Sequence, residues 1–194
     1  MPPSSPDGTA VAFVQADADW AANKRISHIW RARVDGTAAT QLTYGEEGES
    51  GPQWAPAGPP LAFIGKRAGA DVAQLHLLPM AGGEAQVLTS RATAVSNPAW
   101  SPDGRWLYFL AADPKPEEQL AREKAKDDVF AFDEDFEQRH LWRIDVTTRA
   151  ESRVTTGDFS VLNYELSRDG AKIAHHRAPS PNFGDGGQSE VWLM

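Results

Sequence analysis

A four-residue turn motif recurs four times along the 194 residues, and it constrains the fold more than any other feature. Two copies read Ser-Pro-Asp-Gly, and the other two keep the final Gly. Proline presets φ at the second position of a tight turn, and Asp and Gly suit the positions that follow. Each copy therefore predicts a turn between two strands. The copies are Ser5–Gly8, Ala55–Gly58, Ser101–Gly104 and Ser167–Gly170.

The segments after each turn also repeat. Each turn leads into a short run typical of a strand, at Ala10–Val14, Leu61–Ile64, Trp106–Leu110 and Lys172–His176. A second run follows, at Ile29–Val34, Leu75–Leu78, Leu141–Val146 and Val191–Met194. Three copies then end in threonine, and an identical interval separates Thr43, Thr89 and Thr155 from the next turn. Repeats of roughly 50 residues with β-type content indicate propeller blades, each a four-stranded antiparallel sheet.

We therefore predict an all-β fold: a partial β-propeller of about four antiparallel blades in one domain, residues 1–194. The expected blades are about 1–43, 44–89, 90–155 and 156–194. Both alternating faces of Trp106–Leu110 are apolar, as expected for a strand that neighbouring blades cover on both sides. The alternative is a β-sandwich with coincidental turns, which the constant interval disfavours.

The first and last blades are expected to be incomplete. No strand precedes Ser5, and the last copy stops inside its third strand at Met194. Uncovered blade edges invite association. The expected partners are the remaining blades or a hydrolase domain, in the same or a separate chain, or a second copy that pairs through open edges.

Residues 113–138 form an insertion of different character, with ten acidic and four basic side chains. Pro116 followed by early Glu and late Lys predicts a short helix over Glu117–Lys126. An aromatic segment, Val129–Phe136, comes next. The insertion is either a solvated excursion fixed to the blade edge or a lid or docking segment over a binding cavity.

Composition and motifs exclude several classes of function. Zero cysteines exclude disulfides and thiolate sites, and a net charge of −8 argues against binding nucleic acid. The sequence contains no G-x-S-x-G elbow, P-loop, H-E-x-x-H or calcium loop, and Asp133–Asp135 is at most a weak cation site. We expect no catalytic residue, no metal and no cofactor. No apolar span or secretory signal is evident, which favours a cytoplasmic location.

The histidines differ in what they suggest. His28 and His140 share one slot of the repeat, expected at a strand end or blade rim, and His76 is expected to be a core histidine with a hydrogen-bond partner. His175 and His176 replace apolar residues and point to opposite faces of one strand, so they cannot chelate one ion together. With Arg177 they either line a functional opening or reflect drift of the repeat. Tryptophans at one blade position (Trp30, Trp142 and Trp192) are expected to serve packing.

With Trp100–Phe109, Arg139–Val146 and Leu166–Gly170 in view, the chain resembles the N-terminal β-propeller of prolyl oligopeptidase family serine peptidases. The segments Asp127–Phe130 and Ser189–Met194 are most similar to the bacterial acylaminoacyl-peptidase and dipeptidyl-peptidase branch. The resemblance covers the whole chain but only about half of a family propeller.

This resemblance implies a hydrolase domain with a Ser, Asp and His triad that this sequence does not contain, so the chain alone is expected to hydrolyse nothing. It implies a non-catalytic role in which the propeller gates and positions short peptides. The candidate substrate-binding residues are Arg139, His140, His175 and Arg177. The turn motifs also resemble those of TolB-like propellers, so a stand-alone module for protein–protein interaction is the alternative.

Overall fold

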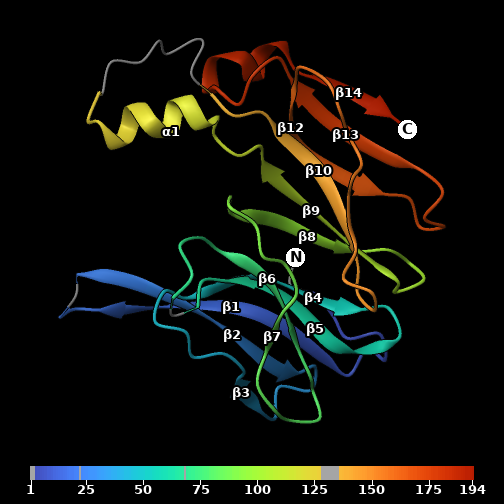
Figure 1. Ribbon diagram of the computed structural model, residues 1–194. Helices are drawn as coiled ribbons and strands as arrows, with labels where there is room; N and C mark the ends of the chain where they lie inside the picture. Colours follow the sequence, from blue (N-terminus) through green and yellow to red (C-terminus); the bar gives the residue numbers. More distant parts are fainter. Residues whose placement is uncertain (1–2, 22, 68, 128–135) are drawn as a thin grey trace.

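Four antiparallel sheets, arranged as successive wedges, make up the protein (Figure 1). The computed structural model describes residues 3–21, 23–67, 69–127 and 136–194. The first sheet contains β1 (Ala10–Asp19), β2 (Lys24–Arg33) and β3 (Ala39–Gln41), and the second contains β4 (Glu49–Ala55), β5 (Gly58–Gly65), β6 (Gln74–Leu78) and β7 (Gln86–Val87). The third contains β8 (Val95–Trp100), β9 (Trp106–Ala112), β10 (Arg139–Asp145) and β11 (Glu151–Arg153), and the fourth contains β12 (Ser160–Leu166), β13 (Ile173–Ala178) and β14 (Glu190–Leu193).

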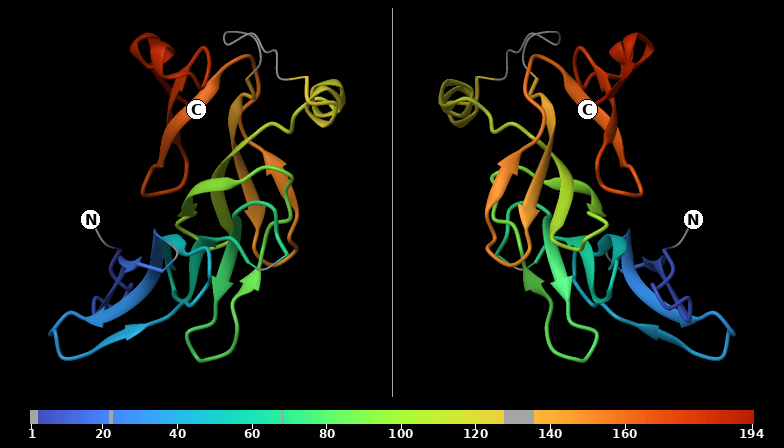
Figure 2. Two further views of the ribbon diagram at one scale, coloured as in Figure 1. Left: turned by 90° about the vertical axis from the view of Figure 1, so that its left-hand side faces the viewer. Right: turned by 90° about the vertical axis from the view of Figure 1, so that its right-hand side faces the viewer.

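Strands within each sheet are paired in chain order, and consecutive sheets pack against each other. The predicted all-β partial propeller with incomplete first and last blades is confirmed, because the sheets have three, four, four and three strands. β4, β8 and β12 are the first strands of the other three sheets. Among the described residues, the first sheet has only one bridge, between Ser4 and Val11, in the place of such a strand. The view from the side shows the sheets fanning out from one another (Figure 2).

The turn motif has one geometry in the three copies that contain Ser and Asp. In the third copy, Ser101 Oγ donates to Asp103 Oδ1 and accepts the backbone N–H of Trp106, while Asp103 Oδ1 accepts that of Arg105. The same bonds recur in the first and fourth copies. The closing glycine has a positive φ, +71° at Gly104, which explains why every copy ends in Gly. The sequence repeat is therefore a repeated hydrogen-bonded turn.

The repeated threonines also have one structural role. Thr43, Thr89 and Thr155 are buried, and each hydroxyl accepts the backbone N–H of the residue 14 positions earlier, at 2.9–3.0 Å. Each of these hydrogen bonds holds the last strand of a blade against the strand before it. The last strands, β3, β7 and β11, are only two or three residues long. We call them the latch threonines. This bond explains the constant interval in the sequence.

The hydrophobic core consists of clusters between consecutive sheets. In β9, Phe109 packs into the cluster shared with the second sheet, whereas its neighbour Leu110 packs into the cluster shared with the fourth. Both side chains are fully buried. Neighbouring strand residues point to opposite faces, so β9 is covered on both sides, as its apolar sequence predicts.

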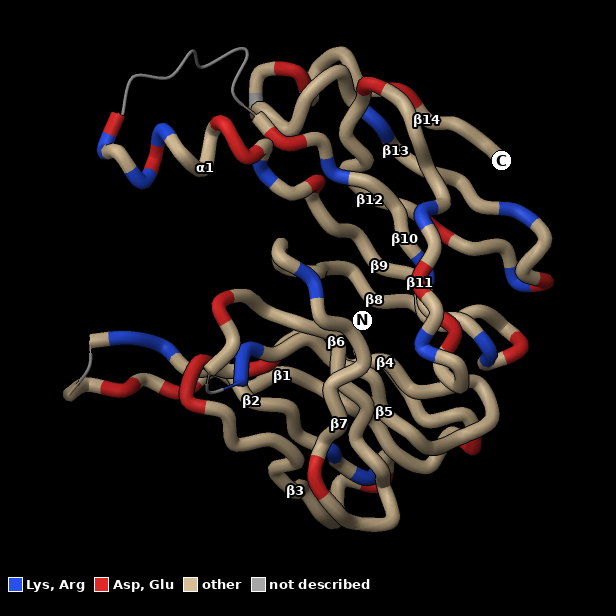
Figure 3. Tube along the Cα trace, in the orientation of Figure 1, with Lys and Arg blue, Asp and Glu red and all other residues tan. Residues whose placement is uncertain are grey.

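The insertion contains the predicted helix, α1, at Glu117–Lys124, which ends before Lys126 because that residue has a φ of +57°. None of its side chains is buried, and it projects away from the sheets in all views (Figures 1 and 2). Its first turn contains Glu117 and Glu118 and its last turn Arg122 and Lys124, so charges of both signs lie along it (Figure 3). Most of the expected aromatic segment and the triplet Asp133–Asp135 lie outside the described residues. No helix among the described residues is long and apolar enough to cross a membrane.

Candidate functional site

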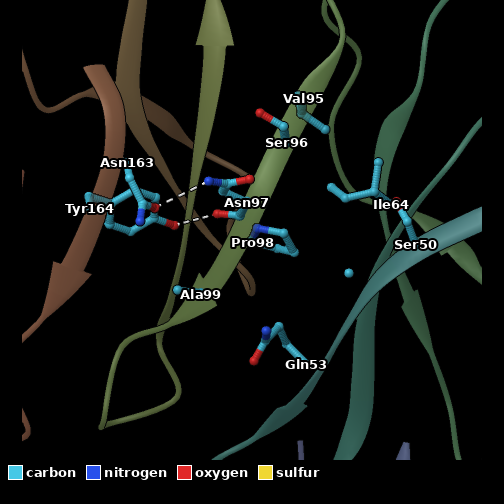
Figure 4. A pocket seen from close by; sticks show the side chains of 11 residues that line it. Ser50, Gln53, Ile64, Val95, Ser96, Asn97, Pro98, Ala99, Asn163 and Tyr164 are labelled. Carbon is cyan, nitrogen blue, oxygen red and sulfur yellow. Dashed lines mark hydrogen bonds between the residues drawn. The ribbon is translucent and has the colours of Figure 1, made fainter. Parts of the chain in front are cut away.

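A pocket of about 460 Å³ lies where the first strands of the last three sheets, β4, β8 and β12, face one another. We call it the axial pocket. It is open to solvent, and strands of three different sheets supply its lining (Figure 4). The lining residues are Ser50, Gly51, Gln53, Ile64, Val95, Ser96, Asn97, Pro98, Ala99, Asn163 and Tyr164.

Bulges shape this pocket. The register of all three strands shifts close to the strand's start. The shifts lie between Ser50 and Gln53 in β4, between Ser96 and Ala99 in β8, and between Val161 and Asn163 in β12. Gly51 and Asn97 occupy equivalent repeat positions and have positive φ values of 60° and 50°. A Cβ at Gly51 would lie 3.2 Å from the Pro98 ring. Bulges turn a strand and redirect its side chains, so these shifts open the wall of the pocket.

Hydrogen bonds join the third and fourth sheets at the pocket wall. Asn97 Nδ2 donates to Asn163 Oδ1 at 3.3 Å, and the Tyr164 hydroxyl donates to the Asn97 carbonyl at 2.6 Å (Figure 4). Burial raises the pKa of Tyr164, so its hydroxyl remains a donor. The wall is therefore held in one arrangement by its own polar groups.

The chemistry of the axial pocket is polar and uncharged. None of its 11 lining residues is ionisable at neutral pH, and the polar groups are amides and hydroxyls. Amide side chains both donate and accept, as a peptide main chain does. These residues were not predicted from the sequence. The pairs Gly51-Pro52 and Asn97-Pro98, at one position of the repeat, could have indicated the bulges that place them.

Two of the four sequence-predicted site residues hold sheets together. Arg139 Nε and Nη2 donate to the carbonyls of Val161 and Leu162 at 2.9 and 3.2 Å, which ties β10 to β12. Partial burial lowers the pKa of Arg139. His140 is fully buried, with Nδ1 3.2 Å from the latch Thr155. Of the two places expected for the histidine slot, a strand end or a blade rim, His140 takes the first, because it is the second residue of β10, and it is buried there.

The other two, His175 and Arg177, lie in β13 and point to the same face of it. His175 is 6% exposed, and its ring stacks on Phe159 with centroids 6.1 Å apart. The Arg177 guanidinium lies 4.7 Å from the Phe159 ring centroid and 3.8 Å from that of Trp192. Both residues therefore contact one phenylalanine that the sequence analysis did not single out.

Phe159 also contacts His140 edge-to-face, at 5.4 Å between centroids. Three of the four candidates thus surround one ring, and Arg139 lies beside it because its backbone N–H donates to Ser160 Oγ. We call His140, Phe159, His175 and Arg177 the Phe159 cluster. None of the four candidates lines the axial pocket. Elsewhere, the core role predicted for His76 is confirmed, since it is buried with Nε2 3.1 Å from the Gly65 carbonyl.

No cluster of carboxylates and histidines suited to a metal ion occurs among residues 3–21, 23–67, 69–127 and 136–194. The electrostatics of the Phe159 cluster are cationic instead. Burial first, and then the charges of Arg153 and Arg177 respectively, lower the pKa values of His140 and His175, while Asp113 opposes this at His140. The cluster is a packed junction between two sheets.

No protein-family model matches the chain. It is 36% identical over 129 residues to YuxL of Bacillus subtilis (strain 168), an uncharacterized peptidase, a match that covers 66% of this chain and 20% of that protein. The chain therefore spans only a fifth of the length of the curated relative it matches.

Solved structures with the same fold include TolB proteins and peptidases. A putative TolB from Agrobacterium tumefaciens has a TM-score of 0.67 at 20% identity, covering 98% of this chain and 59% of that one. Acylaminoacyl peptidase from Pyrococcus horikoshii has a TM-score of 0.65 at 18% identity, covering 91% and 27%. The β-propeller domain of the Trilobed protease from Pyrococcus furiosus has a TM-score of 0.59 at 15% identity, covering 100% and 54%. The solved structures therefore show a propeller fold for this chain, and its relative in sequence is a peptidase.

Proposed function

We propose that the chain is the non-catalytic propeller portion of an acylaminoacyl- or dipeptidyl-peptidase-like serine peptidase, which gates and positions short peptides for a hydrolase domain. The observation that carries this proposal is the 36% identity to a peptidase over two thirds of the chain. The TolB neighbours match it only at the level of the fold, at 20% identity or less.

The axial pocket supports the positioning role. Its amide and hydroxyl groups come from three sheets, so an extended segment placed there contacts several blades at once. A peptide main chain presents a donor and an acceptor at each residue. The side-chain amides of Gln53, Asn97 and Asn163 can pair with groups of both kinds. The pocket is too narrow for a folded protein, because its volume is that of a small ligand.

Peptide binding by the chain itself tests this role. Titration with a capped tetrapeptide, followed by amide NMR shifts, should perturb β4, β8 and β12, and aminoacyl anilides should not be hydrolysed. Asn97→Gly removes the side chain and tolerates the positive φ, so it should weaken binding several-fold. Asn23→Gly is the matched control, because Asn23 has nearly the same φ of 49° and lies outside the axial pocket.

Absence of peptide shifts on β4, β8 and β12 would contradict peptide positioning. Turnover that survives purification would contradict the non-catalytic role. The alternative function is a TolB-like module for protein–protein interaction, because a putative TolB structure shares the fold with a TM-score of 0.67, beside 0.68 for an acylaminoacyl peptidase. It predicts binding to a folded protein and no response to short peptides.

A further inference from the structure

The junction between the third and fourth sheets contains two buried histidines whose ring nitrogens are poorly satisfied. Nε2 of His140 and both ring nitrogens of His175 are buried without a hydrogen-bond partner among the described residues. A neutral imidazole packs against an aromatic ring at moderate cost. A protonated one needs two acceptors for its N–H groups, and a buried charge without them is strongly unfavourable.

The groups around the two rings add to this cost. Near His140 stand Asp113, whose Oδ2 is 3.8 Å from Nε2, and Arg153, which already binds Asp113 at 3.1 Å. Arg177 faces His175, and its own carboxylate partner, Glu190, is 3.7 Å away. Other charged or titratable groups at the junction include Arg139, which donates to the carbonyls of Val161 and Leu162. Asp158 accepts from Gln138, Tyr164 donates to Asn97, and the buried Tyr108 packs in the same cluster. The junction thus holds three arginines before any histidine is protonated.

We propose that this junction is sensitive to acid: protonation of His140 and His175 loosens the fourth sheet, β12–β14, from the third. The loss would be local because the imidazoles contact Phe159, which immediately precedes β12. Protonating both rings raises the number of cationic groups at the junction from three to five, and among the described residues Asp113 and Glu190 are the carboxylates within 4.0 Å of them.

The direction of the pH effect follows from linkage. Both histidines have pKa values below the ordinary 6.5 in the folded chain, so the unfolded chain binds more protons near that pH. Their contribution to stability is complete above about pH 6.5 and is lost as the pH falls toward the folded pKa values. Each histidine changes the opening equilibrium by at most about tenfold per pH unit.

The junction between the first and second sheets is an internal contrast. There His28 lies 3.0 Å from the buried Glu49 carboxylate, which also binds Arg67 at 3.1 Å. His28 therefore has a carboxylate partner, which His175 lacks among the described residues. The equivalent repeat positions of Glu49 are the buried Val95 and Val161, so this carboxylate is a feature of the first junction alone. Acid should therefore open the two junctions unequally.

Hydrogen–deuterium exchange of the intact chain at pH 7.5 and pH 5.5, corrected for intrinsic rates, tests the acid sensitivity of this junction. Peptides from β12 and β13 should lose protection about tenfold or more at pH 5.5 and regain it on return, while β4–β6 stay protected. His175→Phe restores the residue found in the other three copies and should keep β12 protected. His140→Gln, which uses the Gln74 side chain of the same slot, should do so in part.

His176→Gln is the matched control, since His176 is the next residue and bonds Ser189 on the opposite face. It should leave the acid response of the wild type unchanged. A uniform loss of protection in all sheets, no loss at pH 5.5, or an undiminished loss in both H175F and H140Q would overturn the proposal. If H175F does not fold at pH 7.5, H140Q alone decides. This inference does not depend on peptide binding, so each proposal can fail separately.

Discussion

Replacing a latch threonine with valine should destabilise the chain by about 1–3 kcal/mol. Valine nearly preserves the volume of threonine, so packing changes little, but it leaves a buried backbone N–H without its acceptor. In the three copies the orphaned N–H groups are those of Ile29, Leu75 and Leu141. A buried polar group that loses its partner retains its full desolvation cost, which sets the size of the effect.

The structure also ranks the three substitutions. The Thr89 hydroxyl donates to Gln74 Oε1 at 2.7 Å, and the Thr155 hydroxyl lies 3.2 Å from His140 Nδ1. Among the described residues Thr43 makes only the backbone bond through its hydroxyl. Thr43→Val should therefore lower the stability least. The other two substitutions should lower it more, because each also breaks a hydrogen bond to a second buried side chain.

Urea unfolding followed by circular dichroism measures these differences, with serine variants as controls. Serine keeps the hydroxyl and loses one methyl group, worth about 0.8 kcal/mol. At each position the valine variant should have the lower midpoint. A valine variant as stable as its serine counterpart would refute the claim that the hydrogen bond, and not side-chain volume, fixes this residue in the repeat.

Three further changes have definite expected outcomes. Gly104→Ala forces a side chain into φ +71° and should lower the melting temperature by about 2–4 °C, whereas Gly184→Ala, with no positive φ and no atom within 4 Å of the added Cβ, should not. The Asp145 carboxylate accepts hydrogen bonds from Arg105 and two backbone N–H groups, which lower its pKa to about 2. Its contribution to stability is therefore present above about pH 4 and lost toward pH 2. Asp145→Asn should reduce the pH dependence of the free energy of unfolding in that window. Arg139→Lys retains the charge but cannot span two carbonyls, so hydrogen exchange of β12 should accelerate at pH 7.5, with no change in β5.

The repeat predicted the architecture because it reflects local physics. Each Ser-Pro-Asp-Gly turn is closed by bonds within six consecutive residues, and each latch threonine bonds within its own blade. Such interactions leave a constant interval in the sequence. The strand count and the apolar faces of β9 follow from the same repeat.

Contacts between sheets were not predictable in this way. His140 was expected at a strand end or blade rim because its slot is polar in every copy; it lies near the start of β10, but its contact with Phe159 of the next repeat was not predicted. Arg139 was proposed to contact a ligand, yet its guanidinium is engaged by carbonyls of β12. The bulges that form the axial pocket leave only a Gly-Pro or Asn-Pro pair as a signal. Each of these features depends on what the neighbouring sheet places opposite.

Two departures from the repeat lie at these junctions, and they differ in charge. At the first junction an apolar position has become Glu49, which supplies a carboxylate to His28 and Arg67. At the third, an aromatic position has become His175, which brings a titratable ring beside Arg177 without a carboxylate of its own. Packing alone would favour the apolar residue in both places, because a buried polar side chain must be compensated. The compensation is complete at Glu49 and incomplete at His175, so the third junction is where a change of pH acts first.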